Sequence, residues 1–361
     1  MSLLTGAFRT LAALCAAGMV VAGFAAGPAY AKPADRAPAG AGYQVKRLVS
    51  RSGAMFLPSD GGNPINNRGL VAGSTTVAQV SRAAVFDLRT KRMRVLSAFA
   101  GQRTEATDIN GRGEVSGTVY PASGGSRAFW WSTKTGRVRM LPLHGGTASV
   151  SIALNDRGIV LGSVQDPDWT PTIWDVRAGT DRRLTELDDA QAINNRGWVA
   201  GTAHYRADSR ASKALVRRPS GTLIELPFLP GDDSSLVTGI NDTGQVVGTS
   251  MNVEQEDELF GVPVVWTVRG RTVCALTRPG DLDTPFAIND RGRIVGGYLT
   301  AGSAEDRPYR AVTWSHCGAD PVTLPGRPAH AFGVNDRGRI VGRGDLFLST
   351  AYGVLWTRHR T

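Results

Sequence analysis

Acidic side chains gather in four short stretches in the second half of the sequence. GDDSS, EQEDE, DLD and ED place carboxylates at Asp232, Asp233, Glu254, Glu256, Asp257, Glu258, Asp281, Asp283, Glu305 and Asp306. Carboxylates from neighbouring loops could hold a structural divalent cation or a cationic ligand. Two carboxylates roughly 5 to 10 Å apart could instead cut a glycosidic bond as acid and base. The remaining interpretation is a solvated acidic edge, and the fold decides which of these stretches meet.

Other residue types show no catalytic spacing. The five histidines are His144, His204, His316, His330 and His359. None has metal-ligand spacing to a second histidine or a cysteine, so we interpret each as a loop or surface residue. The sequence has no G-x-S-x-G nucleophile motif between a strand and a helix. It also has no glycine-rich phosphate loop before a helix. We therefore expect no catalytic residues and no cofactor, apart from the cation that the acidic loops could hold.

A sevenfold repeat determines which elements position these loops. Its copies are PINNRGLVAGS (64–74), DINGRGEVSGT (108–118), ALNDRGIVLGS (153–163), AINNRGWVAGT (192–202), GINDTGQVVGT (239–249), AINDRGRIVGG (287–297) and GVNDRGRIVGR (333–343). The period lies between 39 residues (155 to 194) and 48 residues (241 to 289). Seven copies at such a period indicate a repeat architecture.

Each copy predicts a tight hairpin between two strands. The structural turn residues are Asn66, Gly69, Asn110, Gly113, Asn155, Gly158, Asn194, Gly197, Asn241, Gly244, Asn289, Gly292, Asn335 and Gly338. The glycine supplies the positive φ that closes the turn, and the asparagine side chain can bond to the backbone ahead of it. A second glycine inside the next strand, such as Gly162, indicates close approach of another backbone, as in inner strands crowded around an axis.

Two further strands follow each hairpin. The third carries an aromatic residue in six copies, such as Trp174 and Trp266, which we interpret as packing between neighbouring sheets. Arg217 takes this place in the fourth copy, and we interpret it as a local exception at the surface. Four strands in each of seven copies predict an all-β fold, a seven-bladed β-propeller with four-stranded blades.

The two ends of the sequence support a closed ring. Only five residues follow Trp356, so the last copy lacks a fourth strand, whereas YQVKRLVS (43–50) is a spare strand before the first copy. We expect the N-terminal strand 43–50 to complete the last blade and close the ring. An open β-solenoid is the alternative, and it would leave both the spare and the missing strand unexplained.

The motif I-N-x-x-G-x-V-x-G, followed by an A-F-x-W strand, resembles the HAF family of extracellular repeats over residues 43–361. In that family a His-Ala-Phe tripeptide opens the aromatic strand, whereas Arg127-Ala128-Phe129 stands there in this sequence. The tripeptide His330-Ala331-Phe332 lies before a turn instead, and we interpret it as coincidence. The resemblance implies an extracellular repeat protein and carries over no catalytic residues.

The N-terminal segment is typical of export. One arginine, an apolar run and Ala29-Tyr30-Ala31 predict a signal peptide over 1–31, a flexible leader over 32–42 and one propeller domain over 43–361. A single membrane anchor is the alternative for this run. After cleavage we expect a secreted or cell-surface monomer without a membrane span. Cys274 and Cys317 then remain, either as free thiols or as a disulfide between blades.

Strand direction distributes the charges over two faces. The tight turns place Arg68, Arg112, Arg157, Arg196, Arg291 and Arg337 on one basic face, while the acidic stretches fall in loops of the opposite, acid-rich face. With a net charge of +10, a basic protein tends towards anionic partners. We predict a non-enzymatic binding or scaffold module for anionic envelope or extracellular polysaccharide, or for a protein, and expect no nucleic acid. The alternative is a carbohydrate-active hydrolase or lyase that uses the loop carboxylates.

Overall fold

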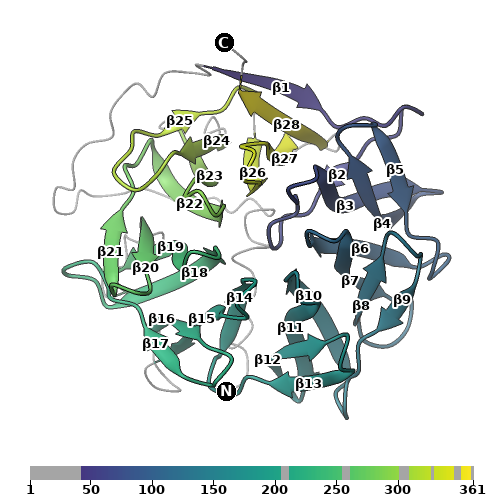
Figure 1. Cartoon of the computed structure of the whole chain (residues 1–361), viewed down its shortest axis with the longest axis horizontal. Coiled ribbons are helices and arrows are strands. Elements are labelled where there is room, and N and C mark those ends of the chain that lie inside the picture. Colours follow the sequence, from purple (N-terminus) through teal and green to yellow (C-terminus); the bar gives the residue numbers. More distant parts are fainter. Residues whose placement is uncertain are drawn as a thin grey trace, which may run out of the picture.

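The computed structural model describes residues 42–204, 211–253, 261–300, 309–326, 329–344 and 351–358. They form seven four-stranded antiparallel sheets arranged as blades around a central axis (Figure 1). This confirms the predicted seven-bladed β-propeller. No helix long and apolar enough to cross a membrane occurs among these residues.

The strands form four concentric layers, and within each layer they follow one another from blade 1 to blade 7. The innermost strands are β2 (Leu57–Pro58), β6 (Arg103–Ile109), β10 (Ala148–Leu154), β14 (Asp189–Ile193), β18 (Ser234–Ile240), β22 (Asp281–Ile288) and β26 (Ala329–Val334). The second strands are β3 (Leu70–Val77), β7 (Glu114–Tyr120), β11 (Ile159–Asp166), β15 (Val199–His204), β19 (Gln245–Met251), β23 (Ile294–Leu299) and β27 (Ile340–Gly344). The third strands are β4 (Val80–Asp87), β8 (Arg127–Ser132), β12 (Asp168–Asp175), β16 (Ser212–Arg217), β20 (Val262–Thr267), β24 (Tyr309–Trp314) and β28 (Tyr352–Arg358). The outermost strands are β5 (Arg92–Val95), β9 (Val138–Met140), β13 (Thr180–Arg183), β17 (Leu223–Glu225), β21 (Thr272–Ala275), β25 (Val322–Thr323) and β1 (Tyr43–Arg47).

The ring closes as the sequence predicts. β1 pairs antiparallel with β28, with Val45 opposite Trp356, and becomes the outermost strand of blade 7 (Figure 1). The strand ends at Arg47, earlier than predicted, because the chain then folds back in a short loop where Val49 pairs with Met55. Strands from both ends of the chain therefore share one sheet, and this shared blade closes the ring.

The seven turn asparagines link every blade to the next. Asn155 Oδ1 accepts the backbone N–H groups of Arg157 and Ile159, both at 3.0 Å, and its Nδ2 donates to the Asn194 carbonyl oxygen at 3.0 Å. The same interblade bond recurs at all seven blades, with distances from 2.9 to 3.1 Å, and runs from Asn335 back to Asn66. Gly158 has a φ of 82°, so both predicted roles are confirmed, and the asparagine also joins neighbouring blades.

Tryptophans of the third strands fill the spaces between blades. Trp174 is buried, and its Nε1 donates to the Pro142 carbonyl oxygen of blade 2 at 3.0 Å. Trp266, Trp314 and Trp356 are buried and bond to the preceding blade in the same way. A Cβ at Gly162 would overlap the Val150 carbonyl oxygen and come within 2.9 Å of the Trp174 ring. This confirms the packing role of the aromatics and the close approach inferred from the strand glycine.

Blade 4 replaces the tryptophan by a buried cation. Arg217 is 1% exposed, so its interpretation as a surface residue is wrong. Its Nε donates to the Glu186 carboxylate, and its Nη1 donates to the Arg218 carbonyl oxygen at 3.0 Å. Glu186 lies shortly after the outermost strand of blade 3. Pro142, whose carbonyl oxygen accepts the hydrogen bond of Trp174, lies at the equivalent place after the outermost strand of blade 2. A charged acceptor compensates for the charged donor, which is the condition for burying a guanidinium.

Blade 1 sends its inner segment towards the axis. β2 has only two residues, and the following segment, 59–63, lies near the centre of the ring (Figure 1). Asn63 exchanges two hydrogen bonds of 3.0 Å with the Val334 backbone of blade 7. A Cβ at Gly61 would come within 2.9 Å of Thr107 Cγ2 of blade 2 and 3.9 Å of the Ile152 carbonyl oxygen of blade 3. The segment therefore contacts three other blades inside the ring.

A buried carboxylate anchors this segment. Asp108 accepts the backbone N–H groups of Ile109 at 2.7 Å and Leu154 at 2.9 Å, and a backbone hydrogen bond from Asn63. Burial raises the pKa of Asp108 to about 7, although these hydrogen bonds lower it. Asp108 thus ties blade 2 to blade 3 and to the segment of blade 1.

Candidate functional site

Unpaired arginines ring the face formed by the tight turns. All six predicted basic-face residues, Arg68, Arg112, Arg157, Arg196, Arg291 and Arg337, are exposed. None of their guanidinium groups forms an ion pair or a side-chain hydrogen bond with the described residues, and only their backbone N–H groups bond to the turn asparagines, as in Arg68 and Arg112. Each turn fixes the backbone of its arginine, so the exposed side chains start from regular positions around the axis.

The same face has an acidic centre that our sequence analysis missed. The second turn residue is Asp156, Asp242, Asp290 or Asp336 in four blades. These carboxylates accept backbone N–H groups from the preceding blade, for example Asn195 N to Asp242 Oδ1 at 2.6 Å and Asp242 N to Asp290 Oδ1 at 2.8 Å. Burial raises the pKa of Asp290, and the other three carboxylates add to this. The signal was present in the sequence as the residue after each turn asparagine.

On the acid-rich face, the structure describes only part of the candidate set. Asp232 and Asp233 are half-buried and lie before β18; Asp232 accepts the Ser250 hydroxyl at 2.6 Å, and Asp233 accepts the Val253 N–H at 2.9 Å. Burial raises the pKa of Asp232. The hydrogen bond from Ser250 lowers this pKa, and the negative charge of Asp233 raises it further. Asp283 is buried and pairs with Arg278 at 3.1 Å.

The other acidic candidates lie beyond what the structure describes. Glu254, Glu256, Asp257, Glu258, Glu305 and Asp306 fall outside the described residues, and only the backbone of Asp281 is described, opposite Leu299. Among the described residues, no three His, Cys, Asp or Glu side chains are arranged to hold a metal ion. The structural divalent cation and the ligand role of these carboxylates therefore stay predictions.

Some of the carboxylates described on the acid-rich face have basic partners. Asp60 pairs with Arg343 at 3.0 Å, Asp166 with Arg183 at 3.6 Å, and Asp188 with His204 Nδ1 at 3.1 Å. Pairing lowers the net field that this face presents to solvent. Asp232 and Asp233 bond to neutral donors instead, so pairing lowers the field of the acid-rich face without removing it.

His330 lies in an aromatic cluster between blades 6 and 7. It is 1% exposed, so its interpretation as a loop or surface residue is wrong. Its ring is 4.4 Å from Tyr309, 5.5 Å from Phe286 and 5.7 Å from Phe332 between centroids. Its Nε2 is buried without a hydrogen-bond partner among the described residues, and burial lowers its pKa to about 3. The neutral imidazole therefore acts as an aromatic core residue.

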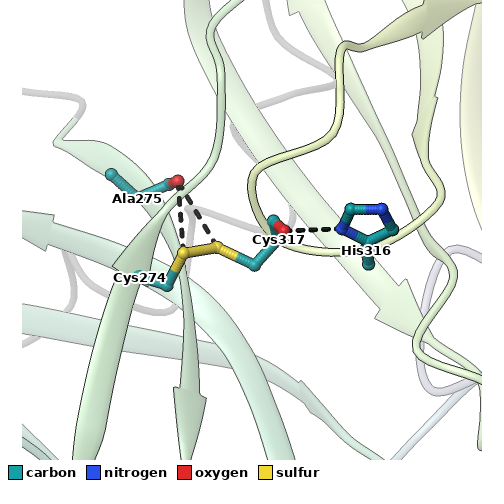
Figure 2. The surroundings of a disulfide bond; sticks show 4 residues. All are labelled: Cys274, Ala275, His316 and Cys317. Atoms are coloured by element: carbon teal, nitrogen blue, oxygen red, sulfur yellow. Dashed lines mark hydrogen bonds between the residues drawn. A yellow bond between two sulfur atoms is a disulfide. The ribbon is translucent and has the colours of Figure 1, made fainter.

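The cysteine pair lies at the outer rim of blades 5 and 6. Cys274 belongs to β21 and Cys317 follows β24, with their Cα atoms 6.4 Å apart in a disulfide (Figure 2). The two sulfur atoms lie 3.7 and 3.5 Å from the Ala275 carbonyl oxygen (Figure 2). Of the two alternatives left by the sequence, the structure supports the bridge between neighbouring blades.

Two hollows of the described surface lie where neighbouring blades meet. One of about 90 Å³ is lined by residues of blades 2 and 3, including Arg139 and Trp174. Another of about 340 Å³ is lined by residues of blades 4 and 5, including Pro227 and Arg271. Neither is lined by a candidate carboxylate.

Trp198 is an aromatic residue that the sequence reasoning did not single out, and it packs against the core between blades 4 and 5. It follows the turn glycine of blade 4 and is half-buried. The guanidinium carbons of Arg196 and Arg218 lie 5.5 and 5.2 Å from its ring centroid. Its place directly after the turn, outside the aromatic third strands, was the signal that could have found it.

Comparison with known proteins supports the fold. No protein-family model and no curated protein matches the sequence. The structure is similar to an oligogalacturonate lyase from Vibrio parahaemolyticus, with 11% identity, a TM-score of 0.60 and coverage of 86% of this chain and 93% of that chain. It is also similar to the β-propeller domain of the trilobed protease from Pyrococcus furiosus, with 11% identity, a TM-score of 0.57 and coverage of 83% and 95%.

A virginiamycin B lyase from Staphylococcus aureus gives a further match, with 12% identity, a TM-score of 0.55 and coverage of 88% of this chain and 100% of that chain. At these identities the likeness shows the propeller fold alone, since one fold serves many activities. The resemblance to HAF repeats stays a prediction.

Proposed function

We propose that this chain is an extracellular, non-enzymatic binding propeller whose basic face docks on anionic polysaccharide of the cell envelope or its surroundings. The observation that carries the proposal is the set of six exposed turn arginines without a carboxylate partner in the described residues. A rigid ring fixes the backbone positions of these arginines, so binding has to order only their side chains and not the turns that carry them. Export rests on the predicted signal peptide over 1–31.

The charge pattern supports a polymer more than a small ion. The arginines surround the axis, while the carboxylates of Asp156, Asp242, Asp290 and Asp336 lie closer to it. An anionic chain would therefore lie over the blades, away from the acidic centre. Exposed charges are screened over about 8 Å at physiological ionic strength, so binding should weaken strongly as salt is added.

The test is retention of the purified chain on polysaccharide across a salt series. The matrices are polygalacturonate, dextran sulfate, neutral dextran and isolated cell-wall material, and each supernatant is assayed for released sugars. We expect salt-sensitive retention on the anionic matrices, no retention on dextran and no product. Absence of retention on every anionic matrix would overturn the proposal and make a protein partner the better hypothesis.

The alternative of a carbohydrate-active hydrolase or lyase depends on the acid-rich face. The raised pKa of Asp232 beside Asp233 is the observation that favours it, because a general acid must keep its proton near neutral pH. Released sugars in the same supernatants would support this alternative. Asp232→Asn should then abolish the product, whereas a contaminating enzyme would leave it unchanged.

A further inference from the structure

Three arginines from two blades converge beside a single indole on the basic face. Arg196 and Arg218 lie over the Trp198 ring at 5.5 and 5.2 Å. A Cβ at Gly197 would come within 3.2 Å of the Arg157 guanidinium carbon and 3.3 Å of Pro219 Cγ. Arg157 of blade 3 therefore lies against the turn that carries Arg196, and we name Arg157, Arg196, Trp198 and Arg218 the indole–arginine cluster.

This cluster has no internal anion. Among the described residues none of its guanidinium groups has an ion pair or a side-chain hydrogen bond, and the nearby Glu186 carboxylate is bonded to Arg217 and lies 3.9 Å from Arg182. The next turn has Thr243 in place of arginine, and its hydroxyl donates to Asn241 Oδ1 at 2.8 Å. The Trp198 ring rests on this turn, 3.2 Å from the position of a Cβ on Gly244. Thr243 thus leaves the indole to the three arginines of blades 3 and 4.

Like charges held close together repel, and an indole offsets only part of this repulsion. An anionic group placed between the guanidinium groups would remove the repulsion. A guanidinium offers two parallel N–H donors, which suit a carboxylate or a sulfate. The ring of Trp198 is already covered by two cations, so a nucleobase could stack only by displacing one of them.

We infer that the indole–arginine cluster is a subsite for one acidic sugar unit of a polysaccharide, whose carboxylate or sulfate group bonds to the arginines that Trp198 holds. The inference rests on the proposed docking of the basic face and adds a fixed point to it. Arg196 and Arg218 supply the bonds to the anion, Arg157 closes the side towards blade 3, and Trp198 positions the guanidinium groups. The remaining arginines of the face then contribute by charge alone.

The test compares variants with equal charge. Arg196→Gln/Arg218→Gln removes two charges from the cluster, and Arg291→Gln/Arg337→Gln removes two from blades 6 and 7 of the same face. We expect the affinity for polygalacturonate to fall about tenfold or more for the cluster pair, the equivalent of one well-placed charged hydrogen bond, and about threefold or less for the control pair. Trp198→Leu keeps the net charge, and we expect a loss of about fivefold because the guanidinium groups lose their platform. Unfolding temperatures confirm that all variants fold.

Each outcome separates this inference from the proposed function. Equal losses for the two arginine pairs, with an unaltered Trp198→Leu variant, would overturn the subsite and leave docking by overall charge intact. Failure of the unmodified chain to bind any anionic matrix would overturn both. The same ranking on dextran sulfate would support a site for either anion, and its absence there would restrict the site to carboxylates. Binding of single-stranded DNA that depends on Trp198 more than on the arginines would overturn the sugar subsite.

Discussion

The blades are joined around the central channel by contacts of two kinds, repeated and irregular. At the end with the tight turns, every blade contributes the same asparagine, and seven interblade hydrogen bonds of 2.9–3.1 Å close a ring. Other contacts inside the ring are made by single blades, such as those of the segment 59–63 of blade 1, of Asp108 of blade 2 and of His330 of blade 7. Repetition therefore secures the ring, whereas individual residues determine what fills it.

Residues with a binding role are best sought among those that depart from the repeat. A residue repeated in every blade, such as the turn asparagine, is explained by the geometry that all blades share. A residue that departs from the repeat needs a local reason, and Trp198 and Arg217 both do so in blade 4. Arg217 has such a reason in Glu186, whereas the exposed guanidinium groups around Trp198 have no structural use among the described contacts.

The largest effect is expected at Asp108, in the irregular part of the channel. Asp108→Ala would leave three backbone N–H groups of Ile109, Leu154 and Asn63 without their acceptor in a buried place. At about 1–3 kcal/mol for each orphaned group, the free energy of unfolding should fall by about 4 kcal/mol. Denaturant unfolding measures it. Asp108→Asn, which keeps one oxygen acceptor, should lose less, and a loss below about 1 kcal/mol for the alanine variant would contradict the anchoring role.

A smaller loss is expected at a single link of the asparagine ring. Asn155→Ala removes two turn hydrogen bonds and one interblade bond, which should cost about 3 kcal/mol in unfolding free energy. Asn155→Asp keeps the acceptors for Arg157 and Ile159 but loses the donor to Asn194. Asn155→Asp should therefore lower the unfolding free energy by about 1–2 kcal/mol. Because only the interblade hydrogen bond is lost, this loss measures that bond alone. An aspartate variant as stable as the original chain would show that the ring bond has no net effect.

In blade 4, Arg217 stands where the third strands of the other blades carry an aromatic residue, and its dependence on Glu186 can be tested. Glu186→Gln would leave the Arg217 guanidinium, which is 1% exposed, without a charged partner. Removing one partner of a buried pair costs about 3–5 kcal/mol, and because Glu186 is partly solvated we expect about 2 kcal/mol. Glu225→Gln is the matched control, since it breaks the Lys213 pair at the surface of the same blade, and should cost less than about 1 kcal/mol. Equal losses would mean that Arg217 does not depend on its carboxylate.

Many of the repeated contacts could be predicted from the sequence, and few of the irregular ones could. The asparagine turns, the strand glycines and the closing strand follow from repeated local patterns, because the same backbone geometry demands the same residue types each time. Asp108 and His330 look like any polar residue in a strand, and only the three-dimensional contacts reveal that they are buried. The turn aspartates recur after the asparagine in four of the seven copies, but the repeat alone does not show that their carboxylates bond to the preceding blade. Trp198 occurs in one copy only.

The smallest effect expected is a pH dependence at His330. The unfolded chain carries an ordinary imidazole of pKa 6.5, whereas burial lowers the pKa of His330 in the folded chain to about 3. Below pH 6.5 the unfolded state therefore binds a proton that the folded state does not, and stability falls as the pH drops towards 3. Between about pH 7.5 and 5.5 this contribution amounts to about 1.4 kcal/mol.

The variant His330→Leu separates this contribution from the opposite one of Asp108. The raised pKa of Asp108, about 7, makes the folded state lose stability as the pH rises from 3.8 towards 7, but Asp108 is present in both chains and cancels in their difference. Unfolding of both chains at about pH 7.5 and 5.5 should show the gap between them move by about 1.4 kcal/mol in favour of the variant at the lower pH. A gap that does not change with pH would mean that the imidazole is protonated in place, and that the seam between blades 6 and 7 admits water or a counter-ion to its Nε2.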